Sequence, residues 1–450
     1  MPAQFALAHR NLAASLLKLA WPVALARLGI MGMGLVDVIV VGQLAPASLP
    51  HQALGWAPTG VMLVTGIGLL TGVQVLAARA IGAGNPQDAG GAWRRGMIVS
   101  LIAGAIAAAL MWLGGARIFT IFGITPDLAE PSADVMRILA LSVPLHLCYC
   151  ATAFFLEAIQ RPMASMIVMW GANAINLALN LMLVPEYGAV GSAWATFGAR
   201  IVLAGGLAIW VLSLRDGAKF GVRSRPSGPS FRALLAIGAA AAVSQAAEAG
   251  AFSAMTILAG RISGEAVAAY QILLNLLALV FMIALGLSTA TAVLTSEAIG
   301  RKAPAEAARA SWMGLLLNTG FMLLAALLVL VAAPVIGRVY TADLSLAAFI
   351  ASLMWLAAAI MPPDGGQVVT AAALRARGDN WFPTASHIFA YAFVMPALAF
   401  WLAEMQGMGV AGLMLAIFWS SVVSVGVLLA RLWALRNVIP NAAIEPSIAH

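Results

Sequence analysis

Residues 231–260, FRALLAIGAAAAVSQAAEAGAFSAMTILAG, contain an apolar run long enough to cross a lipid bilayer. A transmembrane helix needs about 20 such residues, and the run from Ala233 to Gly260 has a single ionisable side chain, Glu248, near its middle. A carboxylate at mid-depth costs about 3 kcal/mol, so it is tolerated where it faces a partner, a cavity or an ion. The stretch predicts a membrane helix with a proton or ion site, and a neutral or hydrogen-bonded structural carboxyl group is the alternative.

The composition extends this prediction to the whole chain. Of its 450 residues, 62% are hydrophobic and 9% are charged, and the mean hydropathy is +0.97, whereas soluble domains have about 25% charged residues. The net charge of +7 does not indicate nucleic acid, because the basic residues lie in short loops between apolar runs. Cys148 and Cys150 point apart on a helix, so we expect them to pack rather than to pair. The sequence predicts an all-α polytopic membrane protein.

Apolar runs of spanning length occur twelve times along the chain. The first has no cleavage site and is too long for a signal peptide, so we expect it to be the first span. With the N-terminus inside, inner segments hold eighteen Lys and Arg residues and outer loops hold three. This excess predicts a multi-pass protein of the inner (plasma) membrane with both termini in the cytoplasm. The runs are approximately 14–43, 53–80, 97–116, 133–157, 163–184, 189–213, 231–260, 265–295, 310–334, 345–374, 383–404 and 409–435.

The second half of the chain repeats the punctuation of the first. A shift of 218 positions places Gly, Thr, Pro and acidic residues on matching residues, which chance similarity between apolar runs does not explain. The matched pairs are Gly42 and Gly260, Gly68 and Gly286, Thr71 and Thr289, Gly82 and Gly300, Pro86 and Pro304, and Asp88 and Glu306.

The repeat predicts two pseudo-symmetric lobes of six helices each. The N-terminal lobe covers residues 1–213, the C-terminal lobe covers residues 231–450 with a short tail, and the basic Gly/Pro/Ser-rich segment 214–230 is the cytoplasmic linker. An even number of spans in each copy leaves the copies parallel, as in two-lobed transporters. A substrate path between the lobes is therefore expected.

Three of the 17 acidic residues lie well inside predicted spans: Asp37, Glu248 and Asp364. Glu248 and Asp364 fall at similar depth in the second lobe. Two carboxylates in a low dielectric cannot both stay ionised unless a cation lies between them. The pair therefore predicts a cation-coupling site for H⁺ or Na⁺. Pro362-Pro363 and Gly365-Gly366 around Asp364 free backbone carbonyls that suit a hard cation such as Na⁺.

Polar side chains in other spans are candidates to support these acids. Asn176 and Asn180 are one turn apart on one helix face, and with Thr196 they form a predicted cluster around Asp37. Interhelical hydrogen bonding without a role in coupling is the alternative. Gln271 and Asn275 share the same spacing and are predicted to supplement the Glu248 site.

Two intramembrane bases have no partner that the sequence identifies. Arg27 lies ten residues before Asp37, which is about 15 Å along a helix, so a direct pair is not expected. Arg200 has no acidic residue at helical spacing.

Together these features resemble the multidrug and toxic compound extrusion (MATE) transporters, in particular the NorM-like branch, over nearly the whole chain. The similar strings are VDVIVVGQL with Asp37, NLALN, GAVGSAWAT, AAEAGAFSAM with Glu248, GEAVAAYQILLN, and PPDGGQVV with Asp364. The resemblance implies the MATE fold of twelve helices and an outward-directed antiporter, driven by Na⁺ or H⁺, for cationic amphiphilic drugs or dyes. His387 and the string HQALGWAP depart from the family pattern.

Other classes of protein fit the sequence less well. A lipid-linked oligosaccharide flippase of the same superfamily would need cationic residues to hold pyrophosphate, whereas here the intramembrane acids equal or outnumber the bases. An enzyme would need a catalytic set, but there is no HExxH or GxSxG and the five His residues are not clustered. A scaffold or channel would not need three deep carboxylates. We expect a monomer in the lipid bilayer that binds no cofactor beyond its coupling ion and no nucleic acid.

Overall fold

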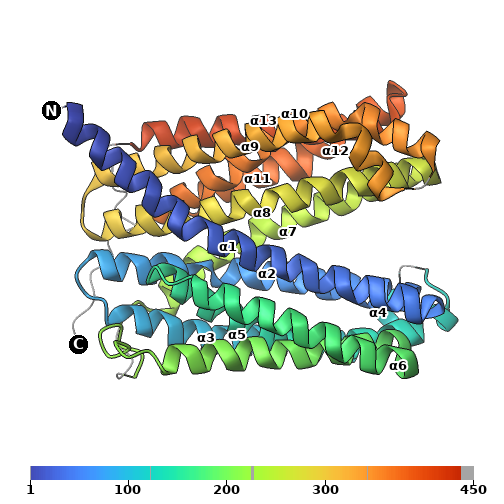
Figure 1. The fold of residues 1–450 in the computed structure, drawn as a ribbon, viewed down its shortest axis with the longest axis horizontal. Coiled ribbons are helices and arrows are strands. Elements are labelled where there is room, and N and C mark those ends of the chain that lie inside the picture. Colours follow the sequence, from blue (N-terminus) through green and yellow to red (C-terminus); the bar gives the residue numbers. More distant parts are fainter. Residues whose placement is uncertain (1, 122, 224–227, 342, 437–450) are drawn as a thin grey trace. The chain divides into compact units, whose positions relative to one another are not determined.

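A computed structural model of the protein describes residues 2–121, 123–223, 228–341 and 343–436, with side chains from residue 11 onward (Figure 1). Within these residues the chain is helical and contains no strand. In this described part of the chain, eleven helices are long and apolar enough to cross a membrane, by length and composition. This confirms the predicted all-α polytopic fold.

The long helices follow one another with short connections. In chain order, the first six long helices are α1 Pro2–Leu44, α2 Leu49–Gly82, α3 Asp88–Gly114, α5 Pro126–Ala158, α6 Met163–Leu212 and α7 Phe231–Ile262. They are followed by α8 Gly264–Gly300, α9 Pro304–Tyr340, α10 Leu344–Arg377 and α13 Gly409–Ala434. The remaining span is built from α11 Trp381–His387, a π-helical turn Ile388–Val394, α12 Met395–Ala399 and a second π-helical turn Phe400–Met405.

Helix α6 accounts for the difference between eleven helices and twelve predicted spans. Its 50 residues would extend about 75 Å at 1.5 Å per residue, more than twice the thickness of a bilayer core of about 30 Å. Gly188 breaks it, with φ 56° and ψ −134°, shortly after Pro185. Residues with a side chain rarely adopt such a positive φ, so glycine permits the reversal here. The two segments of α6 correspond to the predicted runs 163–184 and 189–213.

The chain forms two compact units. Among the described residues, 25–242 make up one, here called the N-unit, and 2–24 together with 243–436 make up the other, here called the C-unit. Both divisions fall inside helices, α1 and α7, rather than at the basic linker. The predicted lobe boundaries at 213 and 231 remain a prediction.

Each unit is built around one central helix. In the N-unit α5 packs against α2, α3 and α6, and in the C-unit α10 packs against α8, α9 and α13. Both central helices start 218 residues apart, at Pro126 and Leu344. The repeat that the sequence shows is therefore also present in the order of packing.

Glycine allows close helix contact where α7 enters the N-unit. A Cβ atom on Gly238 of α7 would lie 1.9 Å from the carbonyl oxygen of Leu69 on α2, and one on Gly72 would lie 2.4 Å from the carbonyl oxygen of Leu234. Small residues at helix interfaces are typical of packing inside membranes, where backbones approach closely.

Candidate functional site

Asp37, on α1 in the N-unit, is fully enclosed and is held by three hydrogen bonds. Its Oδ1 accepts from the side-chain amides of Asn176 at 3.0 Å and Asn180 at 2.7 Å, and its Oδ2 accepts from the Thr196 hydroxyl at 2.6 Å. The exposed fraction of the Asp37 side chain is 0%. The predicted cluster of these four residues is therefore present, and all its donors face one carboxyl group.

The break in α6 explains how one helix surrounds Asp37. Asn176 and Asn180 lie before Gly188 and share a helix face one turn apart, whereas Thr196 lies after it. The reversal at Gly188 brings the two segments to the same carboxyl group. A buried carboxylate that accepts several hydrogen bonds is stabilised by them far more than by water-exposed contacts.

Arg200 lies one helical turn beyond Thr196 and is also buried, with 3% of its side chain exposed. Its Nη1 donates to the Ser142 hydroxyl at 2.6 Å, and its guanidinium carbon lies 5.3 Å from the ring centroid of Trp56. Its guanidinium interacts electrostatically with the carboxyl group of Asp37. No partner for Arg200 could be predicted from the sequence, because its contacts come from the distant helices α2 and α5.

A second buried network in the N-unit escaped the sequence interpretation. Arg27 Nη2 lies 3.7 Å from Glu157 Oε1, and the Gln74 amide donates to Glu157 Oε2 at 2.7 Å. Only 2% of the Glu157 side chain is exposed. The guanidinium carbon of Arg27 also lies 5.3 Å from the ring centroid of Phe154. As expected, Arg27 does not pair with Asp37; it pairs with an acid on another helix.

The 218-residue repeat pairs Glu157 with another charged residue. Glu157 is the last residue of the predicted run 133–157, where an acid resembles an ordinary residue at the end of a span. A shift of 218 positions places Glu157 on Arg375 and His146 on Asp364. Charged or titratable residues therefore occupy equivalent positions of the two central helices, α5 and α10.

Asp364, on α10 in the C-unit, has a looser environment than Asp37. Its Oδ1 accepts from the Tyr391 hydroxyl at 3.4 Å and from the Ser421 hydroxyl at 3.3 Å. The two hydroxyls are 3.3 Å apart. The Asp364 side chain is half-buried. Tyr391 belongs to the first π-helical turn, Ile388–Val394, and π-bulges of this kind are frequent at functional sites.

Glu248, on α7, is also half-buried. It interacts electrostatically with Asp364 and with the guanidinium of Arg375 in the last turn of α10. The structure therefore brings the two predicted acids into one electrostatic environment. Arg375, the base beside them, lies one residue beyond the predicted run 345–374.

His387 joins the same region. The Ser244 hydroxyl lies 2.6 Å from its Nδ1, and its ring packs edge-on against Tyr391 with centroids 5.8 Å apart. Tyr391 in turn donates to Asp364. The departure from the family pattern at His387 therefore lies next to the predicted coupling acid.

Gln271 and Asn275 lie on an exposed face of α8 and have other partners. The Gln271 amide donates to the Thr256 hydroxyl at 3.2 Å, and Asn275 Oδ1 accepts from the Tyr340 hydroxyl at 2.9 Å. Their support of the Glu248 site remains a prediction.

The side chains around Glu248 and Asp364 present oxygen atoms. Among the described residues no group of three or more His, Cys, Asp or Glu is arranged to hold a metal ion. Two carboxylates with the hydroxyls of Tyr391 and Ser421 nevertheless provide only oxygen ligands, which hard cations prefer.

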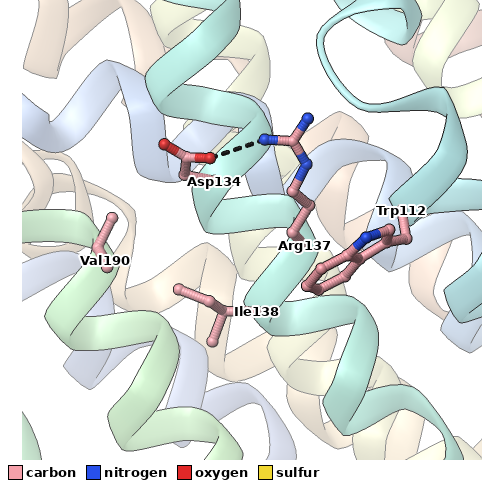
Figure 2. A pocket seen from close by; sticks show the side chains of 5 residues that line it. All are labelled: Trp112, Asp134, Arg137, Ile138 and Val190. Carbon is pink, nitrogen blue, oxygen red and sulfur yellow. Dashed lines mark hydrogen bonds and ion pairs between the residues drawn. The ribbon is translucent and has the colours of Figure 1, made fainter.

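A surface groove of about 550 Å³ lies elsewhere in the N-unit. Figure 2 shows Asp134 and Arg137 of α5 joined by an ion pair, between Trp112 of α3 and Val190 of α6. None of the predicted site residues lines it. Asp37, Glu248 and Asp364 lie away from this groove.

Long apolar helices in two repeated units, each with acids inside, define a polytopic membrane transporter rather than an enzyme. The family profile described as MatE matches residues 22–182 and 240–401, and the chain belongs to this family. The two matched segments begin 218 residues apart, which is the offset of the sequence repeat.

Known relatives extend over almost the whole chain. A probable multidrug resistance protein NorM from Caulobacter vibrioides is 40% identical over 440 residues, covering 95% of this chain and 93% of that protein. The multidrug resistance protein PmpM from Pseudomonas aeruginosa is 29% identical over 393 residues, covering 84% and 81%. An outward-facing structure of a multidrug resistance MATE family transporter shares the fold, with a TM-score of 0.87 at 20% identity over 94% of this chain and 96% of that one.

Proposed function

We propose that the protein is a cation-coupled multidrug antiporter that exports cationic amphiphilic organic compounds by alternating access. The observation that carries this proposal is the enclosure of Asp37 by hydrogen-bond donors from both segments of α6. Such an expensive buried acid is expected where a cation binds and leaves. The names of the relatives, multidrug resistance proteins, supply the class of substrate.

The cycle couples two binding events in opposite directions. A cation that enters from outside binds an acid and disfavours retained drug, and drug that binds from inside displaces the cation. This coupling must be reciprocal: if the cation weakens drug binding, the drug weakens cation binding by the same factor. We place the protein in the inner membrane as a monomer with both termini in the cytoplasm.

The two acid sites favour different coupling ions. Thr196 donates to Asp37 at 2.6 Å, and a hydroxyl can equally accept, so Asp37 can gain a proton without displacing a neighbour. Glu248 and Asp364 are half-buried and have longer contacts, which leaves their oxygens more available to Na⁺. Asp37 therefore favours H⁺ as its coupling ion and the Glu248 and Asp364 pair favours Na⁺, and gradient-driven efflux needs both acid sites.

The charge balance of the N-unit argues against a lipid-linked oligosaccharide flippase. Such a transporter needs positive side chains available to pyrophosphate. Arg27 pairs with Glu157, and Arg200 lies near Asp37. Arg27 is therefore paired with an acid, and the Arg200 guanidinium is engaged by Ser142 and Trp56.

Efflux of ethidium or a fluoroquinolone from cells that express the chain tests the proposal. We expect efflux to depend on a Na⁺ or H⁺ gradient in the wild type and to lose that dependence in Glu248→Gln and Asp364→Asn. Glu306→Gln, a change at an exposed acid, is the matched control and should behave as wild type. Equal gradient-dependent efflux in all four proteins would exclude the C-unit acids, and absence of gradient dependence in the wild type would exclude antiport.

A further inference from the structure

We propose that Arg200 is the resident counter-charge of Asp37 and sets the affinity of this acid for its coupling cation. The inference rests on the proposed function of Asp37 as a coupling site, and it adds a positioning residue that the sequence did not identify. Arg200 acts through Asp37 rather than on the transported compound.

The backbone places the base beside the acid. Arg200 follows Thr196 by four residues on the second segment of α6, so the two side chains share a helix face. Thr196 donates directly to Asp37 at 2.6 Å. Asp37 and Arg200 are both buried, where little water screens their attraction.

The guanidinium is held in position by groups other than Asp37. It donates to Ser142 of α5 at 2.6 Å and packs over Trp56 of α2 at 5.3 Å. Among the described residues no ion pair within 4.0 Å joins it to Asp37. Arg200 is thus a positive charge held by Ser142 and Trp56 one helical turn from Thr196, so a cation can bind Asp37 without first breaking a salt bridge.

The groups around this pair limit what else can titrate. The titratable or charged side chains near Arg200 are Asp37 on α1 and His146 and Cys150 on α5. The contact from α2 is the neutral Trp56, and the contacts to Asp37 from α6 are the neutral Asn176, Asn180 and Thr196. Asp37 is the one carboxyl group in this set.

A fixed guanidinium opposes the effect of burial on the charge of a carboxyl group. Burial by itself favours the neutral, cation-bound form of a carboxyl group, so an isolated buried acid would release its cation poorly. A nearby positive charge opposes this effect, because it stabilises the ionised carboxylate and repels a second cation. A guanidinium suits the role because it keeps its charge at any physiological pH.

The test is the protonation midpoint of Asp37 in the full-length purified protein. It is followed by the infrared carbonyl stretch of the protonated carboxyl group, and Asp37→Asn identifies the band. We expect Arg200→Gln to move the midpoint to higher pH by about one unit or more, a tenfold gain in proton affinity, and Arg200→Lys to keep it near the wild-type value. The pH profile of efflux should move in the same direction.

Controls separate this role from a structural one. Arg117→Gln, at an exposed position, should leave the midpoint unchanged. His146→Gln should also leave it unchanged, and a shift as large as that of Arg200→Gln would overturn the assignment. If Arg200→Gln does not fold, a full-unit shift in Arg200→Lys contradicts the proposal. An unchanged protonation midpoint of Asp37 in folded Arg200→Gln would also overturn the proposal. Absence of gradient-dependent efflux in the wild type would instead overturn the proposed function, and the midpoint test of Arg200 would still apply.

Discussion

The predicted coupling acid of the N-unit and those of the C-unit differ in their burial and in their hydrogen bonds. Asp37 is fully enclosed and accepts three hydrogen bonds of 2.6–3.0 Å. Asp364 is half-buried, and its two hydrogen bonds, at 3.3 and 3.4 Å, go to the same oxygen. The N-unit acid is thus enclosed by short hydrogen bonds, whereas the C-unit acids are half-buried and the hydrogen bonds to Asp364 are longer.

The arginines near these acids also have different partners in the two units. In the N-unit Arg27 lies 3.7 Å from Glu157 and Arg200 hydrogen-bonds to Ser142. In the C-unit Arg375 occupies the position equivalent to Glu157 and interacts with Glu248. The repeat therefore preserves the site of a charge on the central helix while reversing its sign.

The largest expected effect is the loss of coupling in Asp37→Asn. An amide cannot ionise, so the N-unit site would stay in its neutral state and efflux should fall to the level of cells that lack the protein. Ethidium binding to the purified protein should persist, because the amide resembles the protonated acid. Efflux assays and fluorescence binding check both parts, with Asp134→Asn in the same unit as the control. Efflux by Asp37→Asn at half the wild-type rate or more would contradict the role of Asp37 in coupling.

A large loss of stability is expected from Glu157→Gln. Removing one partner of a buried ion pair leaves the other charge uncompensated and typically costs about 3–5 kcal/mol. The thermal unfolding midpoint in detergent should drop clearly, and the double change Arg27→Met with Glu157→Leu should recover most of it. The exposed pair of Asp134 and Arg137, 58% and 32% exposed, is the control, because such pairs contribute about 0–1 kcal/mol. Equal effects at the two pairs would show that Glu157 is not buried as the structure places it.

A moderate effect is expected from Na⁺ on the thermal stability of the protein. If the half-buried pair of acids in the C-unit binds Na⁺, a concentration ten times the dissociation constant stabilises the folded state by about 1.4 kcal/mol. This shift should disappear in Asp364→Asn and persist in Asp37→Asn. Unfolding measured at one pH, with choline replacing Na⁺ as the control, decides the matter. Loss of the shift only in Asp37→Asn would exchange the ion assignments of the two units.

The smallest effect is expected at the first turn of α10, the helix that carries Asp364. Hydrogen bonds from the Ser345 hydroxyl and from the backbone N–H groups of Leu346 and Ser345 hold the pKa of Asp343 below its usual range. A group with a lowered folded-state pKa stabilises the protein above its unfolded pKa, and this contribution is lost as the pH falls through the folded value. Asp343→Asn should lower the unfolding midpoint slightly at neutral pH and converge with wild type in acid. Ser345→Ala should reproduce part of this difference, and a gap that is constant with pH would contradict the assignment.

Sequence reasoning worked best for features that repeat or that cost free energy in lipid. The twelve runs, the 218-residue repeat and the cluster of Asp37 with Asn176, Asn180 and Thr196 all appear in the structure. It missed Glu157 because an acid at the end of an apolar run resembles an ordinary interfacial residue. It gave Arg200 no partner because Ser142 and Trp56 are 58 and 144 residues away in the chain.

Composition and spacing along the chain are enough to predict a helical membrane protein with two related halves and a small number of intramembrane acids. Hydrocarbon tolerates only backbones that satisfy their own hydrogen bonds and tolerates few charges, so composition and spacing carry that information. The packing of the helices adds that Asp37 is enclosed, that Glu248 and Asp364 are half-buried, and that Arg27 pairs with Glu157. Those features depend on how helices distant in sequence pack, because the strength of a buried charge interaction is set by distance and by the exclusion of water.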